Sequence, residues 1–183
     1  MKIFLDCGSN LGQAYTYFKD KYGDNYKYIL LEPNPNCYRK LVADFGDISN
    51  VEIHNKAAYI KDCVKNFRFT DDYSVGGSII ESHNSLYEGK SKQESPVTCI
   101  DVVEMIENLS LENEIIVKFD IESSEYDILE RMIASKTIFK VNKIYCEFHS
   151  QYMNGEDKKE FKMREEKILD FVRHNGIHFE IWH

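Results

Sequence analysis

Acids, glycines and a histidine occur in this sequence where strands are expected to end. The first such segment runs from Asp6 to Gly12 and reads Asp-Cys-Gly-Ser-Asn-Leu-Gly. Glycines let the backbone approach a ligand closely, and Asp6 adds an anion at the strand end. In open α/β sheets, ligands bind at the carboxyl ends of strands near the topological switch point. The segment therefore favours a ligand with an ammonium and a sulfonium over a pyrophosphate.

The same segment lacks the glycine pattern of a Gly-x-Gly-x-x-Gly dinucleotide site. The alternative is a tight strand–helix turn in which Asn10 caps the next helix. A second acid, Glu32, ends the next expected strand and precedes Pro33-Asn34-Pro35. Such an acid can accept hydrogen bonds from both hydroxyls of a ribose. Alone it would be an ordinary exposed carboxylate, but its pairing with the first segment favours binding.

The third segment begins at Lys118 and reads Lys-Phe-Asp-Ile-Glu-Ser-Ser-Glu. Strand alternation places Lys118 and Asp120 on one side of the sheet. Asp120 is expected at the carboxyl end of its strand, next to the first strand. Ser124 with Asp127 fits a capping box for the following helix, so we interpret these two residues and Glu125 as structural.

The fourth segment contains Glu147 and His149 at the end of a later strand, on one side of it. Histidine is the side chain whose pKa best suits it to take up a proton near neutrality. A structural or merely exposed histidine is the other interpretation. Both stay open, although the pair converges on the same sheet edge as Asp6, Glu32 and Asp120.

The elements that position these residues alternate between short apolar runs and helical patterns, which is typical of βαβ units. They predict one α/β domain over 1–183, with a mostly parallel central sheet and helices on both faces. The expected strands are 2–6, 27–32, 51–55, 64–69, 114–119, 143–148 and 177–182. The expected helices follow Leu11 and cover 36–45, 101–108, 124–135 and 157–174.

Residues 71–95 are rich in Ser, Gly, Asp, Glu and Asn, which predicts a long loop. Loops longer than about 12–15 residues in compact domains are usually functional or disordered. We expect a lid over an acceptor site, with Gly76-Gly77 as its hinge. Its expected apolar anchors and polar groups are Ile79, Ile80, Leu86, Tyr87, Asp71, Asp72, Tyr73, Ser78, His83 and Asn84.

Composition excludes several classes of protein. The 183 residues carry a net charge of −8, which disfavours long nucleic acid as a partner. The five cysteines are scattered without a Cys-x-x-Cys pair, which argues against a disulfide framework or a zinc site. No signal peptide precedes Asp6, and no segment approaches the roughly 20 apolar residues of a membrane span. We expect a cytoplasmic protein, and the sequence leaves its oligomeric state open.

Five strings, FLDCGSNLGQ, LLEPNP, NKAAY, IVKFDIESSEYDIL and IYCEFH, together resemble the FkbM family of methyltransferases. They occur in the family's order over about residues 3–149. The resemblance implies a class I, Rossmann-like fold with S-adenosylmethionine as methyl donor. It implies an acceptor hydroxyl on a glycan or another small molecule. The cofactor-binding residues it implies are Asp6, Gly8, Ser9, Asn10, Gly12, Glu32, Asn34, Asn55, Lys56, Ala57 and Asp120.

Two features depart from the family pattern. Ser123-Ser124 stands where the family usually has Gly-Ala, and one final strand stands where class I folds usually finish with a hairpin. These departures leave the cofactor prediction standing but weaken any prediction of the acceptor.

Transfer to a hydroxyl needs a base, for which His149 is the first candidate and Asp120 the second, with Glu147 orienting or assisting. A divalent cation held by these three residues is the alternative, and metal-free catalysis is favoured. Two other functions stay open. One is a non-catalytic module that binds S-adenosylmethionine, and the other is an RNA methyltransferase, which the acidic balance disfavours.

Overall fold

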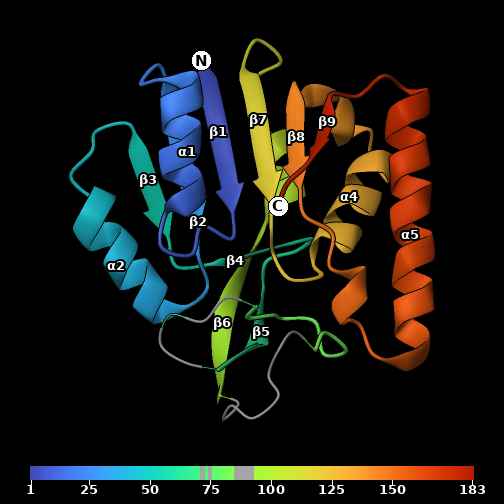
Figure 1. Ribbon diagram of the computed structural model, residues 1–183. Helices are drawn as coiled ribbons and strands as arrows, with labels where there is room; N and C mark the ends of the chain where they lie inside the picture. Colours follow the sequence, from blue (N-terminus) through green and yellow to red (C-terminus); the bar gives the residue numbers. More distant parts are fainter. Residues whose placement is uncertain (71–72, 74–75, 85–92) are drawn as a thin grey trace.

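Parallel strands form the central sheet of the computed structural model, which describes residues 1–70, 73, 76–84 and 93–183 (Figure 1). Within these ranges the sheet has six strands, in the order β3-β2-β1-β7-β8-β9. Their bounds are β1 (Lys2–Cys7), β2 (Tyr26–Leu31), β3 (Val51–His54), β7 (Glu114–Phe119), β8 (Lys143–Cys146) and β9 (Phe179–Ile181). The order reverses direction between β1 and β7, so their carboxyl ends flank the topological switch point.

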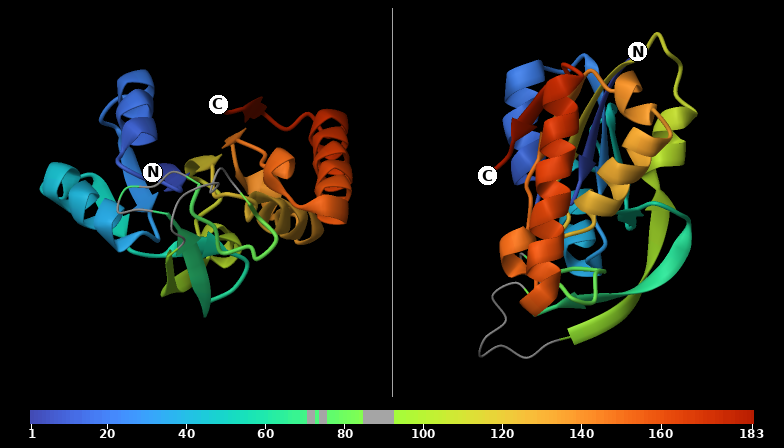
Figure 2. Two further views of the ribbon diagram at one scale, coloured as in Figure 1. Left: turned by 60° about the horizontal axis from the view of Figure 1, so that its bottom comes forward. Right: turned by 90° about the vertical axis from the view of Figure 1, so that its right-hand side faces the viewer.

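Helices cover both faces of this sheet (Figure 2). On one face lie α1 (Gln13–Tyr22) and α2 (Pro35–Phe45), and on the other α3 (Val102–Glu107), α4 (Glu125–Ala134) and α5 (Gly155–His174). Alternation in β1 supplies both cores, because Phe4 packs beneath α1 whereas Ile3 and Leu5 face α4. The predicted fold class is confirmed. No helix of the described residues combines the length and apolar character needed to cross a membrane.

A smaller sheet lies beyond the carboxyl ends of β1 and β7 (Figure 1). Its strands are β4 (Ala57–Tyr59), β5 (Cys63–Phe69) and β6 (Gln93–Asp101), in the order β4-β6-β5. The predicted strand at 64–69 is confirmed, but it pairs antiparallel with β6 and not within the central sheet. The predicted loop over 71–95 is wrong at its end, because pairing with β5 already begins at Gln93.

Residues 76–84 connect the small sheet to the switch point. Ser78 forms an antiparallel bridge with Arg68, and His83 forms one with Met153, which follows a short 3-10 helix, η2 (Ser150–Tyr152). The Ser78 hydroxyl also donates to the carbonyl oxygen of Glu122 at 2.5 Å. Several residues of the expected lid lie outside the described residues, among them Asp71, Asp72, Leu86 and Tyr87. The lid therefore stays a prediction.

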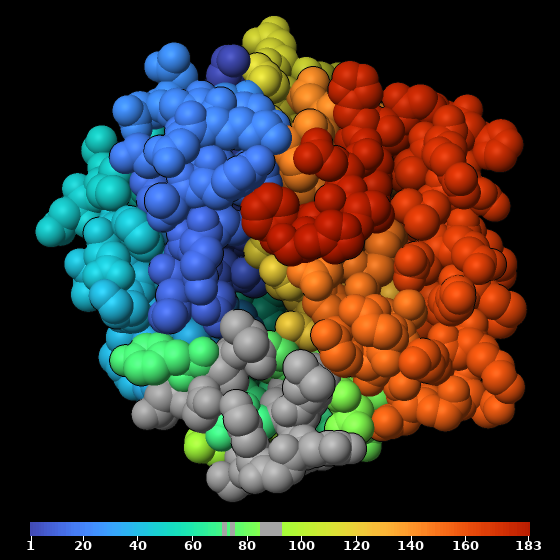
Figure 3. Space-filling model, in the orientation of Figure 1, coloured from blue at the N-terminus to red at the C-terminus, as the bar shows by residue number. Residues whose placement is uncertain are grey.

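The C-terminal strand β9 pairs parallel with β8 and extends the central sheet. The Trp182 ring lies 4.9 Å from the Phe18 ring and 5.4 Å from the Tyr17 ring, between centroids. The C-terminal residues thereby cover the sheet beside α1 (Figure 3). A second 3-10 helix, η1 (Thr137–Lys140), leads from α4 toward β8.

Candidate functional site at the switch point

A buried lysine joins the two acids that the sequence places at the switch point. Lys118 Nζ lies 3.2 Å from Asp6 Oδ1 and 3.3 Å from Asp120 Oδ2, and it donates to the carbonyl oxygen of Gly8 at 2.9 Å. Burial raises the pKa of Asp6, and the nearby ammonium only partly offsets this. The acids raise the pKa of Lys118 against the effect of burial. The structure thus brings Asp6 and Asp120 together, as predicted.

Gly8 is required where β1 ends. Its φ is +84°, and a Cβ there would lie 1.9 Å from the carbonyl oxygen of Asp120. Ser9 is buried, and its hydroxyl donates to the carbonyl oxygen of Asp6 at 3.1 Å. The alternative in which Asn10 caps α1 is wrong, because the N-cap is Gly12 at φ +88°. Gly8, Asn10 and Gly12 all have positive φ in this turn. The Asn10 side chain does not cap α1 and instead donates to Cys37 Sγ.

Glu32 connects the two turns that flank the carboxyl ends of β1 and β2. Its Oε2 accepts from the backbone N–H of Asn10 at 2.8 Å, and its Oε1 from that of Asn34 at 2.8 Å. Burial raises the pKa of Glu32 to about 7, although these N–H groups and Lys118 act in the opposite direction. Each carboxylate oxygen has two lone pairs, so both can accept a further donor.

Asn34 has a donor to spare next to Glu32. Its Oδ1 caps α2, whereas its buried Nδ2 has no hydrogen-bond partner among the described residues. Asn55 reaches the same place, because its Nδ2 donates to the carbonyl oxygen of Glu32 at 2.8 Å. Lys56 follows Asn55, and Ala57 begins β4 and is buried. The structure thus joins Asn55 to the turn after β2, and Lys56 and Ala57 follow it toward β4.

His149 stands among four acids. Its Nε2 lies 3.6 Å from Asp120 Oδ1, 3.6 Å from Glu122 Oε2 and 3.8 Å from Glu147 Oε1. Its Nδ1 lies 3.1 Å from Glu125 Oε1. Burial opposes the charged imidazole, but Glu125, Glu122 and Asp120 outweigh it and raise the pKa of His149 to about 10. At neutral pH the protonated imidazole predominates, so His149 can take up a proton only through its minor neutral form.

Sequence reasoning missed Glu122 as a site residue and misread Glu125. Glu122 continues the alternation of Lys118 and Asp120 by two residues, and this signal could have identified it. Glu125 is fully buried against His149 and does more than start a helix. Ser124 is the N-cap residue of α4, but the predicted capping box is wrong, because its backbone is helical and its hydroxyl makes no capping hydrogen bond.

Ser123 occupies a backbone conformation that favours glycine, with φ at +83°. Its hydroxyl lies 2.8 Å from Nδ1 of His83, and its backbone N–H donates to Glu125 Oε2 at 3.0 Å. Non-glycine residues in this region cost about 1–3 kcal/mol and persist where the surroundings require them. Ser123, which stands where the family usually has Gly, therefore has a hydrogen-bond partner in the buried His83.

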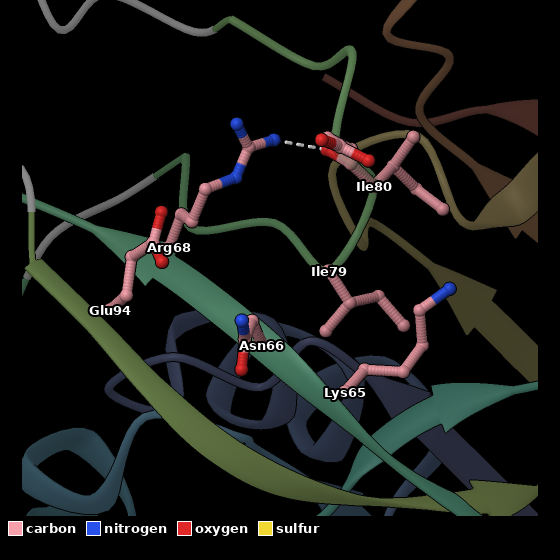
Figure 4. A pocket seen from close by; sticks show the side chains of 7 residues that line it. Lys65, Asn66, Arg68, Ile79, Ile80 and Glu94 are labelled. Carbon is pink, nitrogen blue, oxygen red and sulfur yellow. Dashed lines mark hydrogen bonds between the residues drawn. The ribbon is translucent and has the colours of Figure 1, made fainter.

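A cavity of about 510 Å³ lies between the small sheet and residues 76–84 (Figure 4). Arg68 crosses it to donate to the carbonyl oxygen of Ile80. Ile79 lines the cavity, and the preceding residue, Ser78, donates to the carbonyl oxygen of Glu122. Small-molecule sites usually enclose about 300–1,000 Å³. Its lining residues are Lys65, Asn66, Arg68, Ile79, Ile80, Glu81 and Glu94.

The parallel strand order, with helices on both faces and polar residues at the switch point, defines a Rossmann-like α/β protein. Residues 6–179 match the model of the methyltransferase FkbM domain, which spans nearly the whole chain. The chain belongs to this family and is a methyltransferase.

The other comparisons add little. None of the curated proteins matches the chain. Among solved structures, the yeast methylglyoxal/isovaleraldehyde reductase Gre2 complexed with NADPH is similar at 13% identity and a TM-score of 0.42. The alignment covers 99% of this chain and 56% of the reductase chain.

Proposed function

We propose that the protein transfers a methyl group from S-adenosylmethionine to a hydroxyl of a glycan or another small molecule. The observation that carries this proposal is the buried Glu32 carboxylate beside Asn34 Nδ2, which has no partner among the described residues, with Asp6 and Asp120 across the switch point. Together they offer acceptors for a diol, a donor for a polar ring atom, and negative charge for a cationic ligand.

The residues present fit this cofactor. Gly8 lets the turn after β1 pack directly against the Asp120 carbonyl, so the turns after β1 and β7 lie side by side. Glu32 retains lone pairs for ribose hydroxyls, and Asn55 holds the backbone of the turn after β2 in place. Bound S-adenosylmethionine would supply a methyl group on a sulfonium, which is already an activated leaving group.

The acceptor is proposed to enter from the cavity beside Ile79 and Ile80. That cavity is lined by charged, amide and aliphatic side chains, which suits a hydroxylated molecule with one apolar face. Its wall leads through Ser78 to the turn after β7, where Asp120 lies, and His149 from the segment after β8 faces Asp120 there. These two residues, with Glu147, are the candidates for orienting the hydroxyl and taking its proton.

Removal of the Glu32 carboxylate tests the proposal. Hydrogen bonds to a charged group contribute about 1.5–3 kcal/mol, so Glu32→Ala is expected to weaken S-adenosylhomocysteine binding about tenfold or more. Calorimetry measures this, with NAD as a ligand expected to give no heat. Glu52→Ala is the control. Glu52 is an acid of the neighbouring strand β3 that pairs with Lys27 of β2 and His54 of β3. Equal affinity of the wild type and Glu32→Ala would contradict the proposed cofactor site.

The affinity for S-adenosylhomocysteine is also expected to depend on pH. A pKa of about 7 means that Glu32 is ionised above this pH and protonated below it. Ribose hydroxyls donate to the ionised form, so the dissociation constant should rise about tenfold between about pH 8 and about pH 6. Lys118 and Asp6, the charged groups acting on Glu32, have opposite effects. Glu32→Gln should show a flat profile, and an equally steep profile in this variant would assign the titration to another group.

A further inference from the structure

We propose that Asp120, Glu122 and His149 form a binding site for one divalent transition-metal ion, with His83 at its edge. One ligand atom from each of the three residues lies within 4.8 Å of the others. The proposal goes beyond the proposed function, because methyl transfer from an activated sulfonium does not by itself require a metal.

The separations suit ligands that share an ion. Atoms bound to one ion at about 2.1 Å lie about 3.0 Å apart at right angles and about 4.2 Å apart when opposite. His149 Nε2 lies 3.6 Å from both Asp120 Oδ1 and Glu122 Oε2, between these limits. Both separations are too long for direct hydrogen bonds, so the three groups converge without satisfying one another.

The second observation is a buried pair of polar atoms beside this cluster. The His83 side chain is fully buried, and its Nε2 lies 3.0 Å from Glu122 Oε2, an ion pair only when His83 is protonated. Despite this distance, neither atom makes a hydrogen bond within the described part of the chain. An unsatisfied buried polar atom costs about 1–3 kcal/mol, and a shared ion would satisfy both.

Neighbouring groups already hold the ligands as metal sites require. Metal-bound imidazoles usually engage their other ring nitrogen with a carboxylate or another polar partner. Here Glu125 holds Nδ1 of His149, and the Ser123 hydroxyl holds Nδ1 of His83, which leaves both Nε2 atoms free to face the cluster. Lys118 lies against Oδ2 of Asp120 and leaves Oδ1 on the side of His149.

The backbone around Glu122 supports a clamp. Glu122 and Ser123 have φ of +52° and +83°, and neither is glycine. Such strain is concentrated at ligand clamps and active sites. The turn directs the Glu122 side chain toward His83 and His149, which come from residues 76–84 and from the segment after β8.

The mixed donor set selects the class of ion. Imidazole nitrogen favours Zn²⁺, Fe²⁺ and similar ions, carboxylate oxygen suits Mn²⁺, and Mg²⁺ prefers oxygen alone. The imidazole of His149 with the carboxylates of Asp120 and Glu122 therefore favours Mn²⁺ or Zn²⁺ over Mg²⁺. An ion at this place would lie beside Asp120 and could hold an acceptor oxygen.

Metal titration of the full chain after chelator treatment tests the site. Electron paramagnetic resonance should show one Mn²⁺ bound per chain, and calorimetry one Zn²⁺, with Mg²⁺ at least about tenfold weaker. Glu122→Gln and Asp120→Asn should each weaken Mn²⁺ binding about tenfold or more. Glu81→Gln is the matched control, because Glu81 is an exposed acid in the same segment as His83. Thermal melts check that each variant is folded. If Glu122→Gln does not fold, Asp120→Asn alone provides the test.

Absence of Mn²⁺ and Zn²⁺ binding, or binding that folded Glu122→Gln and Asp120→Asn leave unchanged, would overturn the proposal. Mg²⁺ binding as tight as that of Mn²⁺ would overturn the assigned class of ion. If no metal binds but Glu122→Gln weakens S-adenosylhomocysteine, the acids serve the cofactor's cationic group instead. The same samples titrated with S-adenosylhomocysteine separate the two proposals, since metal binding without nucleoside binding contradicts the proposed function alone.

Discussion

His149→Ala is expected to slow methyl transfer by about 10²–10⁴-fold, which is the usual cost of removing a proton-transfer group. The affinity for S-adenosylhomocysteine should stay within a few-fold, because Glu32 and Asn34 lie in the turn between β2 and α2 and do not contact His149 in any described interaction. His149 has its Nε2 within 3.6 Å of Asp120, so its loss removes the group that faces the transfer region. The measurement is transfer from labelled S-adenosylmethionine to a panel of sugars and other small hydroxylated molecules.

The alanine variant has a second effect that must be separated from the first. It deprives the buried Glu125 of its imidazole partner, and an unpaired buried charge destabilises the fold. His149→Gln keeps a donor toward Glu125 but cannot accept a proton at pH 7. We expect it to melt closer to the wild type while losing a similar share of turnover. Undiminished turnover in both variants would transfer the proton-accepting role to Asp120.

Gly8→Ala is expected to lower the free energy of unfolding by about 2–5 kcal/mol, as the sum of a left-handed backbone and a steric overlap. The new Cβ would lie 1.9 Å from the carbonyl oxygen of Asp120, which is backbone and cannot rotate away. Either the β1 turn or the turn after β7 must move, and both carry site residues. Chemical denaturation measures the loss, and calorimetry should show weaker S-adenosylhomocysteine binding.

Gly176→Ala is the control for the backbone term. Gly176 has a φ of +63° in the turn after α5, and nothing lies within 4 Å of the position its Cβ would take. This variant should lose only about 1–2 kcal/mol and keep its ligand affinity. Equal losses in the two variants would show that the contact with Asp120 contributes nothing.

The sequence by itself determined the central sheet and which acids meet at its edge. The run Glu114–Phe119 is apolar enough to specify a buried strand, and β7 has these bounds. Carboxyl ends of neighbouring parallel strands meet at one edge of a sheet, so Asp6 and Asp120 could be placed together without coordinates. Glu32 followed from the same rule, applied to the next strand.

Only the tertiary structure decided what surrounds His149 and how the acids are paired. The charge on an imidazole depends on burial and on neighbours from other elements, here Glu122 and Glu125, and local sequence carries neither. His83 is held at the site by a backbone β-bridge to Met153 and a side-chain hydrogen bond to Ser123, both of which are distant in sequence. Of the small sheet only β5 was predicted, because β4 and β6 are stabilised by pairing between distant segments, which local sequence does not report.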